Sequence, residues 1–310
     1  MKNIKVVSTG YYLPKIKILN EEISNKLELE DDYIFKRTGI KQRYYINEDE
    51  DIISMAINAT NNAIEKLKIN KQEIEMIIVA TTTTDNLMPG ISYMIQKQLD
   101  IENTICLDVL AGCSGYINAL DIARTYIAID KIKTAVVIGV DCLSKYTNHE
   151  DINTSIILSD GAGATIISES EQEELYYSYI KSEGQKSDIL TCKVNEKIYM
   201  DGIEIYKYAV TETVKSINKI LKESNEEIEN IKYIIPHQSN QRIMNSIAKK
   251  LNIDINKIYT NIEYTGNTFC ASIPIALNEL FEKKLLNKGD KIILLGYGGG
   301  LNTGTILLEV

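Results

Sequence analysis

A cysteine between two glycines is the first candidate for chemistry in this sequence. Cys113 lies in Ala111-Gly112-Cys113-Ser114-Gly115, between a predicted strand and a predicted helix. Glycines permit a tight turn and let a substrate come close to the backbone, as in a nucleophile elbow. Unpaired N–H groups and the positive dipole end at a helix start favour a thiolate, so we expect a lowered thiol pKa. The alternative is a small buried cysteine packed at a helix start.

A histidine in a polar turn is the candidate partner of this cysteine. His237 follows an apolar strand and is one of only two histidines in the chain. Nucleophilic chemistry at cysteine usually needs a positioned proton carrier or hydrogen-bond donor. A histidine at a strand end can also be purely structural. The other histidine, His149, lies in a polar segment where a solvated loop residue is the simpler interpretation.

An asparagine and a glycine stretch are candidates for stabilising negative charge on oxygen. The amide of Asn267, in Gly266-Asn267-Thr268, can donate a hydrogen bond to a carbonyl oxygen that gains charge. The segment 296–300 is Gly-Tyr-Gly-Gly-Gly and can bring backbone N–H groups against a thioester oxygen. It lacks the ending of a phosphate-binding loop. The alternatives are an ordinary turn residue and a glycine-rich turn between strands, and segment 160–164 allows the same second interpretation.

Alternating strands and helices must position these residues. In the first half, periodicity predicts a helix at 52–67, a strand at 76–80, a helix at 90–99, a strand at 104–109, a helix at 115–129 and a strand at 135–140. The second half repeats the order with a helix at 205–221, a strand at 233–235, a helix ending at 251, a strand near Ile258, a helix at 272–286 and a strand at 292–295. Apolar strands alternating with amphipathic helices favour mainly parallel sheets covered on both faces.

The two halves, 1–170 and 171–310, therefore look like structural duplicates. Back to back, they predict a five-layered α/β/α/β/α body with two mixed, mainly parallel sheets. Overlaying the halves equates Cys113 with Asn267, while His237 follows the strand equivalent to 76–80. Because open α/β sheets place sites beyond the carboxyl ends of their strands, we expect the three side chains to face one crevice.

Composition excludes several classes of function. With 310 residues and 44% hydrophobic content, the chain can bury one large domain or two halves sharing a core. No apolar run approaches the roughly 20 residues that cross a bilayer, and the first residues show no signal-peptide pattern, so we expect a cytoplasmic protein. A formal charge of -9 argues against nucleic-acid binding. The five cysteines form no C-x-x-C pair, so neither a disulfide framework nor a metal site is indicated.

Taken in order along nearly the whole chain, the motifs resemble those of the thiolase superfamily, and specifically of β-ketoacyl-acyl carrier protein synthase III. The resemblance rests on Arg37-Thr38-Gly39-Ile40, on the segments 111–115, 160–164, 236–240 and 266–268, and on the glycine turn before Leu301. Elongating synthases use a second histidine where Asn267 stands. Degradative thiolases have a cysteine in the last glycine loop, and hydroxymethylglutaryl-CoA synthases need a catalytic glutamate for which there is no convincing match.

The resemblance implies a priming condensing enzyme of fatty acid or related lipid synthesis, an acyltransferase. Cys113 would take an acyl group from a CoA or carrier-protein thioester. His237 and Asn267 would bind the carbonyl of malonyl-acyl carrier protein as carbon dioxide leaves, and the N–H groups of Cys113 and Gly299 would form the oxyanion hole. An enolate needs donors aimed at its oxygen, which agrees with this assignment. No metal or redox cofactor is implied.

The resemblance also implies a route for the substrate. Arg37 would hold phosphate, and the pantetheine channel is matched by Met200, Gly202, Tyr206, Ser239 and Asn240. Tyr33 and Ile152 stand where family members stack the CoA adenine between Trp and Arg, so we expect weaker CoA affinity. Met88 stands where a Phe usually reaches into the partner subunit's acyl pocket, and the family implies a homodimer.

Acyl carrier proteins are acidic, so a chain with net charge -9 needs a focused positive entrance to receive one. The candidates on helices beside the expected tunnel are Arg242, Lys207, Lys249 and Lys250, with ordinary solvated helix faces as the alternative. Arg242 matches the family's docking position. A second hypothesis, supported by the altered adenine positions, is a synthase-III-like acyltransferase of secondary metabolism that moves the Cys113-bound group to another nucleophile. A non-catalytic scaffold is a third, and the intact Cys113, His237 and Asn267 disfavour it.

Overall fold

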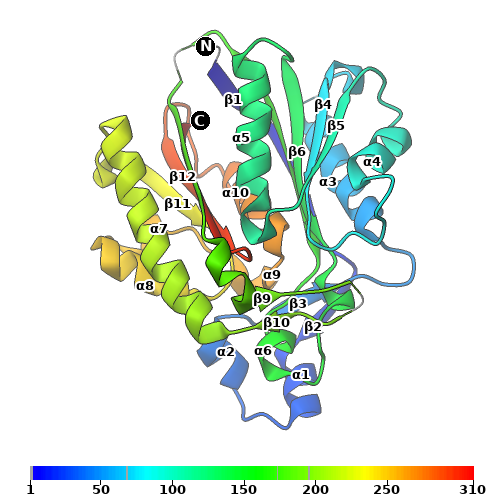
Figure 1. Cartoon of the computed structure of the whole chain (residues 1–310), viewed down its shortest axis with the longest axis vertical. Coiled ribbons are helices and arrows are strands. Elements are labelled where there is room, and N and C mark those ends of the chain that lie inside the picture. Colours follow the sequence, from blue (N-terminus) through cyan, green and yellow to red (C-terminus); the bar gives the residue numbers. More distant parts are fainter. Residues whose placement is uncertain (1–2, 68, 173, 195) are drawn as a thin grey trace.

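The computed structural model describes residues 3–67, 69–172, 174–194 and 196–310. Figure 1 shows helices between the large sheets and further helices on both outer sides.

The first half of the chain forms, in order, β1 (Asn3–Tyr12), β2 (Ile16–Leu19), α1 (Asn20–Leu27), α2 (Tyr33–Thr38), β3 (Gln42–Tyr45), α3 (Ile52–Leu67), η1 (Lys71–Glu73), β4 (Met76–Ala80), α4 (Ile91–Leu99), β5 (Ile105–Val109), η2 (Gly112–Ser114), α5 (Gly115–Ala128), β6 (Thr134–Asp141), η3 (Leu143–Lys145), α6 (Ile152–Ser155) and β7 (Gly161–Ser170). The η elements of this half are 3₁₀ turns of three residues each.

The second half forms β8 (Tyr176–Ser182), η4 (Gly184–Ile189), β9 (Leu190–Thr191), β10 (Tyr199–Met200), α7 (Gly202–Ser224), η5 (Ile228–Asn230), β11 (Ile231–Pro236), α8 (Gln241–Leu251), η6 (Ile255–Lys257), α9 (Ile262–Thr265), η7 (Phe269–Ala271), α10 (Ser272–Glu282), β12 (Lys291–Gly298) and β13 (Asn302–Glu309). The predicted division at residue 170 falls in the connection between β7 and β8.

The two large sheets have corresponding strand orders. The five-stranded sheet runs β1-β7-β6-β4-β5 and the four-stranded sheet runs β8-β13-β12-β11, when read in the same direction. The place of β5 is taken in the second sheet by Ile258, which forms only an isolated parallel bridge to Ile234 of β11. The strand predicted near Ile258 is therefore reduced to this bridge. The matching orders support the duplication inferred from the sequence.

Both sheets are mixed, as predicted, and antiparallel pairs hold a larger share than the sequence pattern suggested. β4 pairs in parallel with β5 and β6, and β11 with β12, whereas β1–β7, β6–β7, β12–β13 and β8–β13 are antiparallel. The β12–β13 connection is a tight turn, which only antiparallel strands allow. Strands buried on both faces are apolar throughout in either direction, so hydrophobic periodicity does not report strand direction.

The five predicted layers follow from three buried clusters. One contains residues of α3 and α4 against the outer face of the first sheet, and another contains residues of α7 and α8 against the outer face of the second. The third joins α5 and α10 to the inner faces of both sheets. Helices buried on all sides are apolar all round, and eight of the eleven residues of α10 are buried. α5 and α10 thus form the central layer.

Local capping explains where two helices differ from their predicted bounds. α7 begins at Gly202 because the Asp201 carboxylate accepts the N–H groups of Ile203 and Glu204. α10 ends at Glu282, short of residue 286, because Lys284 adopts a left-handed conformation with φ 54°. Within the described residues, no helix combines the length and apolar character needed to span a membrane.

Candidate active site

Cys113 lies in the 3₁₀ turn η2, at the amino end of the central helix α5, and is 3% exposed. Two glycines make room for it. Gly112 has φ +56°, and a Cβ there would lie 2.6 Å from the carbonyl oxygen of Gly299. A Cβ at Gly298 would lie 2.7 Å from Cβ of Cys113. The end of β12 can therefore rest directly against the cysteine only because these positions lack side chains.

The expected lowering of the Cys113 pKa is wrong for the structure at rest. Burial raises the pKa of the Cys113 thiol well above its usual range, and the nearby Asp141 carboxylate acts in the same direction. The backbone N–H groups of Gly299 and Cys113 favour the thiolate but are outweighed. The sequence revealed the helix start and not the depth at which the sulfur is buried. Cys113 is a thiol until it reacts.

His237 directly follows β11 and is 2% exposed. Its backbone N–H donates to the carbonyl of Leu295 at 2.7 Å, which fixes it to the end of β12. Its Nδ1 lies 2.7 Å from Oγ of Ser272, and its ring meets the edge or face of Tyr297 and Phe269 at centroid distances of 5.3 and 6.4 Å. Burial lowers the pKa of His237 to about 3, so the ring is neutral near neutral pH.

Asn267 stands immediately before η7, at the amino end of the second central helix, and is 4% exposed. Its backbone is held on both sides, because its N–H donates to Ile157 at 3.0 Å and its carbonyl accepts from Ser159 at 2.9 Å. Its Oδ1 accepts the N–H of Phe269 at 3.1 Å. Since the amide oxygen is engaged, the NH₂ group is the end that can donate to a substrate.

The structure brings the three predicted catalytic residues together. The turns carrying Cys113 and Asn267 are joined by Cys270, whose thiol donates to the carbonyl of Gly112 at 3.1 Å. Phe269 shares a buried cluster with Cys113 and also contacts the His237 ring. The other members of this apolar cluster, which surrounds the nucleophile, are Leu143, Leu158 and Ile198, with Tyr146 and Leu190 packed against it. An acyl group on Cys113 would meet an apolar wall.

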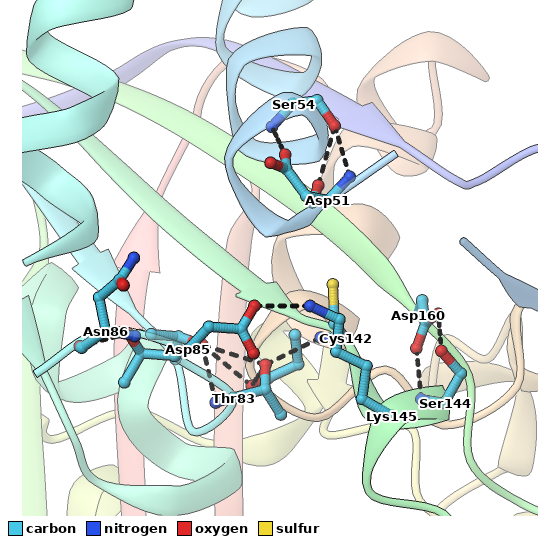
Figure 2. A network of polar contacts seen from close by, with 12 residues as sticks. Asp51, Ser54, Thr83, Asp85, Asn86, Cys142, Ser144, Lys145 and Asp160 are labelled. Carbon is cyan, nitrogen blue, oxygen red and sulfur yellow. Dashed lines mark hydrogen bonds and ion pairs between the residues drawn. The ribbon is translucent and has the colours of Figure 1, made fainter. Parts of the chain in front are cut away.

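Two buried carboxylates hold the chain that follows β6, which carries Leu143 of this cluster. Asp141 accepts from Thr81, Thr82 and Thr83 beyond β4, and its second oxygen accepts the N–H of Cys270 at 3.0 Å. Asp160 accepts the N–H of Ser144 at 2.7 Å and its hydroxyl at 2.5 Å, as Figure 2 shows. Burial raises the pKa of Asp160 to about 6. The carboxylates tie segments from both halves around the site.

A surface ion pair extends this network to the loop after β4. Lys145, at the end of η3, pairs with Asp85 at 2.5 Å, and Thr83 Oγ1 accepts the N–H of Cys142 at 2.8 Å (Figure 2). The loop also carries Met88, which is 87% exposed and lies outside the Cys113 cluster within this chain. The ion pair therefore links the loop of Met88 to one wall of the site.

The predicted substrate residues gather at the ends of α2, α7 and α8. The guanidinium of Arg37 lies 4.8 Å from the ring centre of Tyr33, and Tyr33 and Ile152 pack against the same small apolar cluster. The Asn240 amide donates to the carbonyl of Arg37 at 3.3 Å. These contacts bring Tyr33 and Asn240 to Arg37, and Ile152 packs against the same apolar cluster as Tyr33.

The other channel positions are distributed over three elements. Tyr206 of α7 bonds Ser246 of α8 at 2.6 Å, and Ser239 bonds the Tyr297 hydroxyl at 2.7 Å. Met200 ends β10, and Gly202 begins α7. The hydroxyls of Tyr206 and Ser239 thus already have protein partners, and a pantetheine arm would share or displace them.

Of the predicted docking residues, Arg242 is bonded to α2, and the three lysines lie on α7 and α8. The Arg242 guanidinium donates to the carbonyl of Lys36 at 3.1 Å, which places it beside α2. Lys249 and Lys250 are exposed in the last turn of α8, and Lys207 of α7 is paired with Glu204 at 2.6 Å. Arg242 is thus bonded to the residue that directly precedes Arg37 in α2.

Sequence reasoning missed Ser272, Phe269 and Asp141. Ser272 is 35 positions from the histidine that it contacts, and Asp141 is 129 positions from Cys270. Phe269 has φ 45°, which is rare for a bulky residue. Phe269 and Ser272 follow Asn267 closely in the sequence, which was the available signal for these two residues. Asp141 ends β6 and has no such neighbour. Within the described part of the chain, no group of three or more His, Cys, Asp or Glu side chains could hold a metal ion.

Comparison with known proteins agrees with this geometry. Residues 107–184 match the family model of 3-oxoacyl-[acyl-carrier-protein] synthase III, and residues 221–310 match the model of its C-terminal part. Beta-ketoacyl-[acyl-carrier-protein] synthase III of Clostridium tetani is 41% identical over 99% of this chain and 98% of the relative. The corresponding protein of Clostridium beijerinckii is 38% identical over the full length of both.

Solved structures extend the comparison to the fold. The crystal structure of 3-oxoacyl-[acyl-carrier-protein] synthase III from Aquifex aeolicus VF5 is 36% identical, covers 100% of both chains and has a TM-score of 0.96. That of the synthase III from Thermus thermophilus is 26% identical, covers 98% of both chains and has a TM-score of 0.95. The chain belongs to the 3-oxoacyl-[acyl-carrier-protein] synthase III family, the thiolase-fold condensing acyltransferases that prime fatty acid synthesis.

Proposed function

We propose that Cys113 accepts an acyl group from a thioester and that this acyl-enzyme condenses with malonyl-acyl carrier protein to give a 3-oxoacyl-acyl carrier protein. The observation that carries the proposal is the meeting of one buried thiol with two side chains that can donate hydrogen bonds. His237 and the NH₂ end of Asn267 approach the thiol from the second half of the chain.

In the first step, the sulfur of Cys113 attacks the donor carbonyl carbon. The carbonyl oxygen gains charge and accepts hydrogen bonds from the N–H groups of Cys113 and Gly299, which already point toward the sulfur. The carbon–sulfur bond of the donor breaks, and the thiol proton passes to the departing thiolate. Because burial favours the neutral thiol, the proton leaves Cys113 as the new bond forms.

In the second step, the thioester carbonyl of the malonyl group accepts hydrogen bonds from His237 and Asn267. The bond to the carboxylate breaks, carbon dioxide leaves, and the electron pair forms an enolate whose oxygen these donors stabilise. The enolate carbon attacks the acyl carbon on Cys113. The carbon–sulfur bond breaks, and the released thiolate takes a proton from solvent. No electrons are gained or lost overall, so the proposal includes no redox cofactor.

The proposed entrance for the carrier protein is the surface where α2 meets α8. Arg242, Lys36 and Arg37 lie there together, joined by the bonds from Arg242 and Asn240 to α2 carbonyls. Along α8, Lys249 follows Arg242 by seven positions and therefore lies on the same helix face. Focused positive charge is what an acidic carrier protein requires of a chain with net charge -9.

The Arg37–Tyr33 contact bears on the choice of acyl donor. The guanidinium covers the tyrosine ring at 4.8 Å, and Ile152 brings no charge to the other adenine position. We therefore keep a carrier-protein-bound donor beside CoA in the proposal, with weak CoA affinity. A cytoplasmic location belongs to the same proposal.

A homodimer completes the proposal. β5 is the last strand of its sheet, with one open edge, and its apolar residues Ile105, Leu107 and Val109 are only partly buried. The chain segments before and after β5 carry exposed apolar side chains, including Leu87, Met88, Tyr93 and Leu110. Open strand edges and apolar patches of this kind mark interfaces, and pairing through β5 would bring Met88 toward the partner's site.

Two variants test whether His237 and Asn267 act in decarboxylation and not in acylation of Cys113. His237→Ala and Asn267→Ala should each slow release of carbon dioxide from malonyl-acyl carrier protein by about 10²–10³-fold, because each removes a donor to the enolate oxygen. Acylation of Cys113, read as added mass on the intact protein, should change far less. Equal loss of both steps in either variant would contradict the assigned roles.

The same assay separates the alternative acyltransferase, which the names of the similar proteins do not favour. Such an enzyme would acylate Cys113 but release no carbon dioxide and form no 3-oxoacyl product. That outcome would refute the condensing reaction for this chain.

Docking has its own test. Arg242→Glu should raise KM for malonyl-acyl carrier protein about 10-fold, because a positive contact is replaced by a repulsive one, while kcat and the rate with malonyl-CoA change little. Lys222→Glu, a charge reversal on the last turn of α7, is the control. An unchanged KM in the Arg242 variant would remove this residue from the entrance.

A further inference from the structure

A buried serine holds the ring of the catalytic histidine. Ser272 is the first residue of α10 and is 2% exposed. Its Oγ lies 2.7 Å from Nδ1 of His237 and 2.9 Å from the carbonyl oxygen of Phe269, and it accepts the N–H of Gln238 at 3.3 Å. Among the described residues, Ser272 is the residue whose side chain is hydrogen-bonded to the imidazole ring of His237. Both partners are buried, so the position of each proton matters.

Hydrogen counting leaves two arrangements for this pair. Ser272 has one hydroxyl proton, and neutral His237 has one ring proton. If the hydroxyl donates to Phe269, Nδ1 must carry the ring proton and Nε2 is left as a bare acceptor. If the hydroxyl donates to Nδ1, the ring proton sits on Nε2.

The second arrangement leaves every group that contacts the Ser272 hydroxyl paired, and the Nε2–H of His237 is left to donate to a substrate. The carbonyl of Phe269 already accepts the backbone N–H of Ser272, so it does not need the hydroxyl. The N–H of Gln238 still finds a lone pair on Oγ. The edge-on rings of Tyr297 and Phe269 limit the tilt of the imidazole but offer no hydrogen bond to Nδ1.

The reaction distinguishes the two arrangements. A carbonyl oxygen that becomes an enolate needs an N–H pointed at it, and a bare Nε2 would repel it. We propose that Ser272 is a positioning residue that donates its hydroxyl proton to Nδ1 of His237, so that the neutral ring carries its proton on Nε2 and presents it to the malonyl thioester. This inference rests on the proposed function, because it assumes that His237 acts as a donor.

The position of the ring proton can be observed directly. A two-bond ¹H–¹⁵N spectrum of protein labelled at histidine, with His149→Gln to leave a single histidine, reports which nitrogen is protonated. We expect the Nε2–H form in the wild-type chain and a shift toward the Nδ1–H form in Ser272→Ala. A wild-type ring with its proton on Nδ1 would overturn the proposal, whatever the activity of any variant.

Kinetics supply the second measurement. Ser272→Ala should slow carbon dioxide release about 10-fold or more, yet less than His237→Ala, whose loss we set at about 10²–10³-fold. Acylation of Cys113 should be nearly unchanged, and Ser272→Thr, which keeps a hydroxyl, should recover most of the decarboxylation rate. Ser216→Ala removes a hydroxyl buried in α7 and serves as the matched control. Wild-type decarboxylation by Ser272→Ala would also overturn the proposal.

The two proposals fail in different ways. If His237→Ala still decarboxylates malonyl-acyl carrier protein, the assignment of His237 as a donor is wrong. If His237→Ala is inactive but the ring proton of the wild-type protein lies on Nδ1, only the role of Ser272 is wrong.

Discussion

Burial keeps both reactive side chains neutral, by opposite shifts of their pKa values. It raises the pKa of the Cys113 thiol and lowers that of the His237 imidazole to about 3, because a charge in an apolar surrounding loses its hydration. The resting site therefore contains a thiol and a neutral ring and not an ion pair. Such a ring can donate one hydrogen bond throughout the neutral range, which is what the condensation step requires.

The buried histidine predicts an acid-sensitive stability. The folded pKa of about 3 lies below the unfolded value of 6.5, so the stabilisation is complete above pH 6.5 and is lost as pH falls toward 3. Each pH unit in this window costs about 1.4 kcal/mol. Between pH 7 and 5, the wild-type chain should lose about 2 kcal/mol of unfolding free energy more than His237→Gln, measured by urea unfolding at fixed protein concentration.

A second histidine provides the comparison for this measurement. His149 is more exposed than His237, so His149→Gln should alter the pH dependence less. Identical pH dependence in wild type and His237→Gln would mean that the pKa of the ring is the same in the folded and unfolded chains, which contradicts the prediction.

At the scale of elements, the site depends on hydrogen bonds that tie the ends of β4 and β6, in the first half of the chain, to the turn η7 in the second half. Asp141 ends β6 and accepts five hydrogen bonds, from the threonines after β4 and from Cys270 in η7. One carboxylate thus connects two parallel strands with the turn that follows Asn267. Because η7 is also bonded to Gly112, this connection fixes the distance between the nucleophile and its partners.

Removing the charge of Asp141 should weaken this junction. In Asp141→Asn an NH₂ group would face N–H or O–H donors, so at least one buried donor loses its acceptor, at a cost of about 2–3 kcal/mol. Urea unfolding of this variant and of Asp121→Asn is the measurement. The Asp121 carboxylate accepts from the Tyr176 hydroxyl in a partly exposed position, so its variant should lose less. A loss no larger than that of the control would show that the junction is not needed for the fold.

At the scale of the whole molecule, β5 is an edge strand whose neighbouring chain segments carry exposed apolar side chains. It lies beside Leu110, which is 78% exposed and only three residues before Cys113. A dimer formed across this edge would cover the apolar side chains and bury the start of the nucleophile's turn.

A charge at Leu110 should separate such a dimer. Leu110→Asp places a carboxylate in the proposed interface, where desolvation is unfavourable, and the exposed position spares the fold of the monomer. Light scattering after size exclusion should report about 70 kDa for the wild type and 35 kDa for the variant, since one chain is 35.0 kDa. Val194→Asp alters an exposed apolar residue between β9 and β10 and is the control. A wild-type chain that elutes as a monomer would contradict the proposed dimer.

The sequence by itself determined the duplicated, layered fold and the placement of Cys113, His237 and Asn267 in turns beside strands and helices, because these depend on local signals. Hydrophobic periodicity marks buried strands and helices, and a reactive residue at a strand end is recognised from its flanking turn. Strand direction was less well predicted, because each antiparallel pair in the two large sheets involves β7 or β13, which the periodicity did not assign as strands. The weak bridge at Ile258 was likewise indistinguishable from a strand.

Only the tertiary structure decided the chemical state and the support of those residues. The pKa of Cys113 depends on how deeply the sulfur is buried, which the adjacent helix start does not reveal. The contact of Ser272 with His237 and that of Asp141 with Cys270 join positions far apart in the chain. Such contacts arise when two sheets pack on the same pair of helices, and packing is a property of the folded chain and not of any segment.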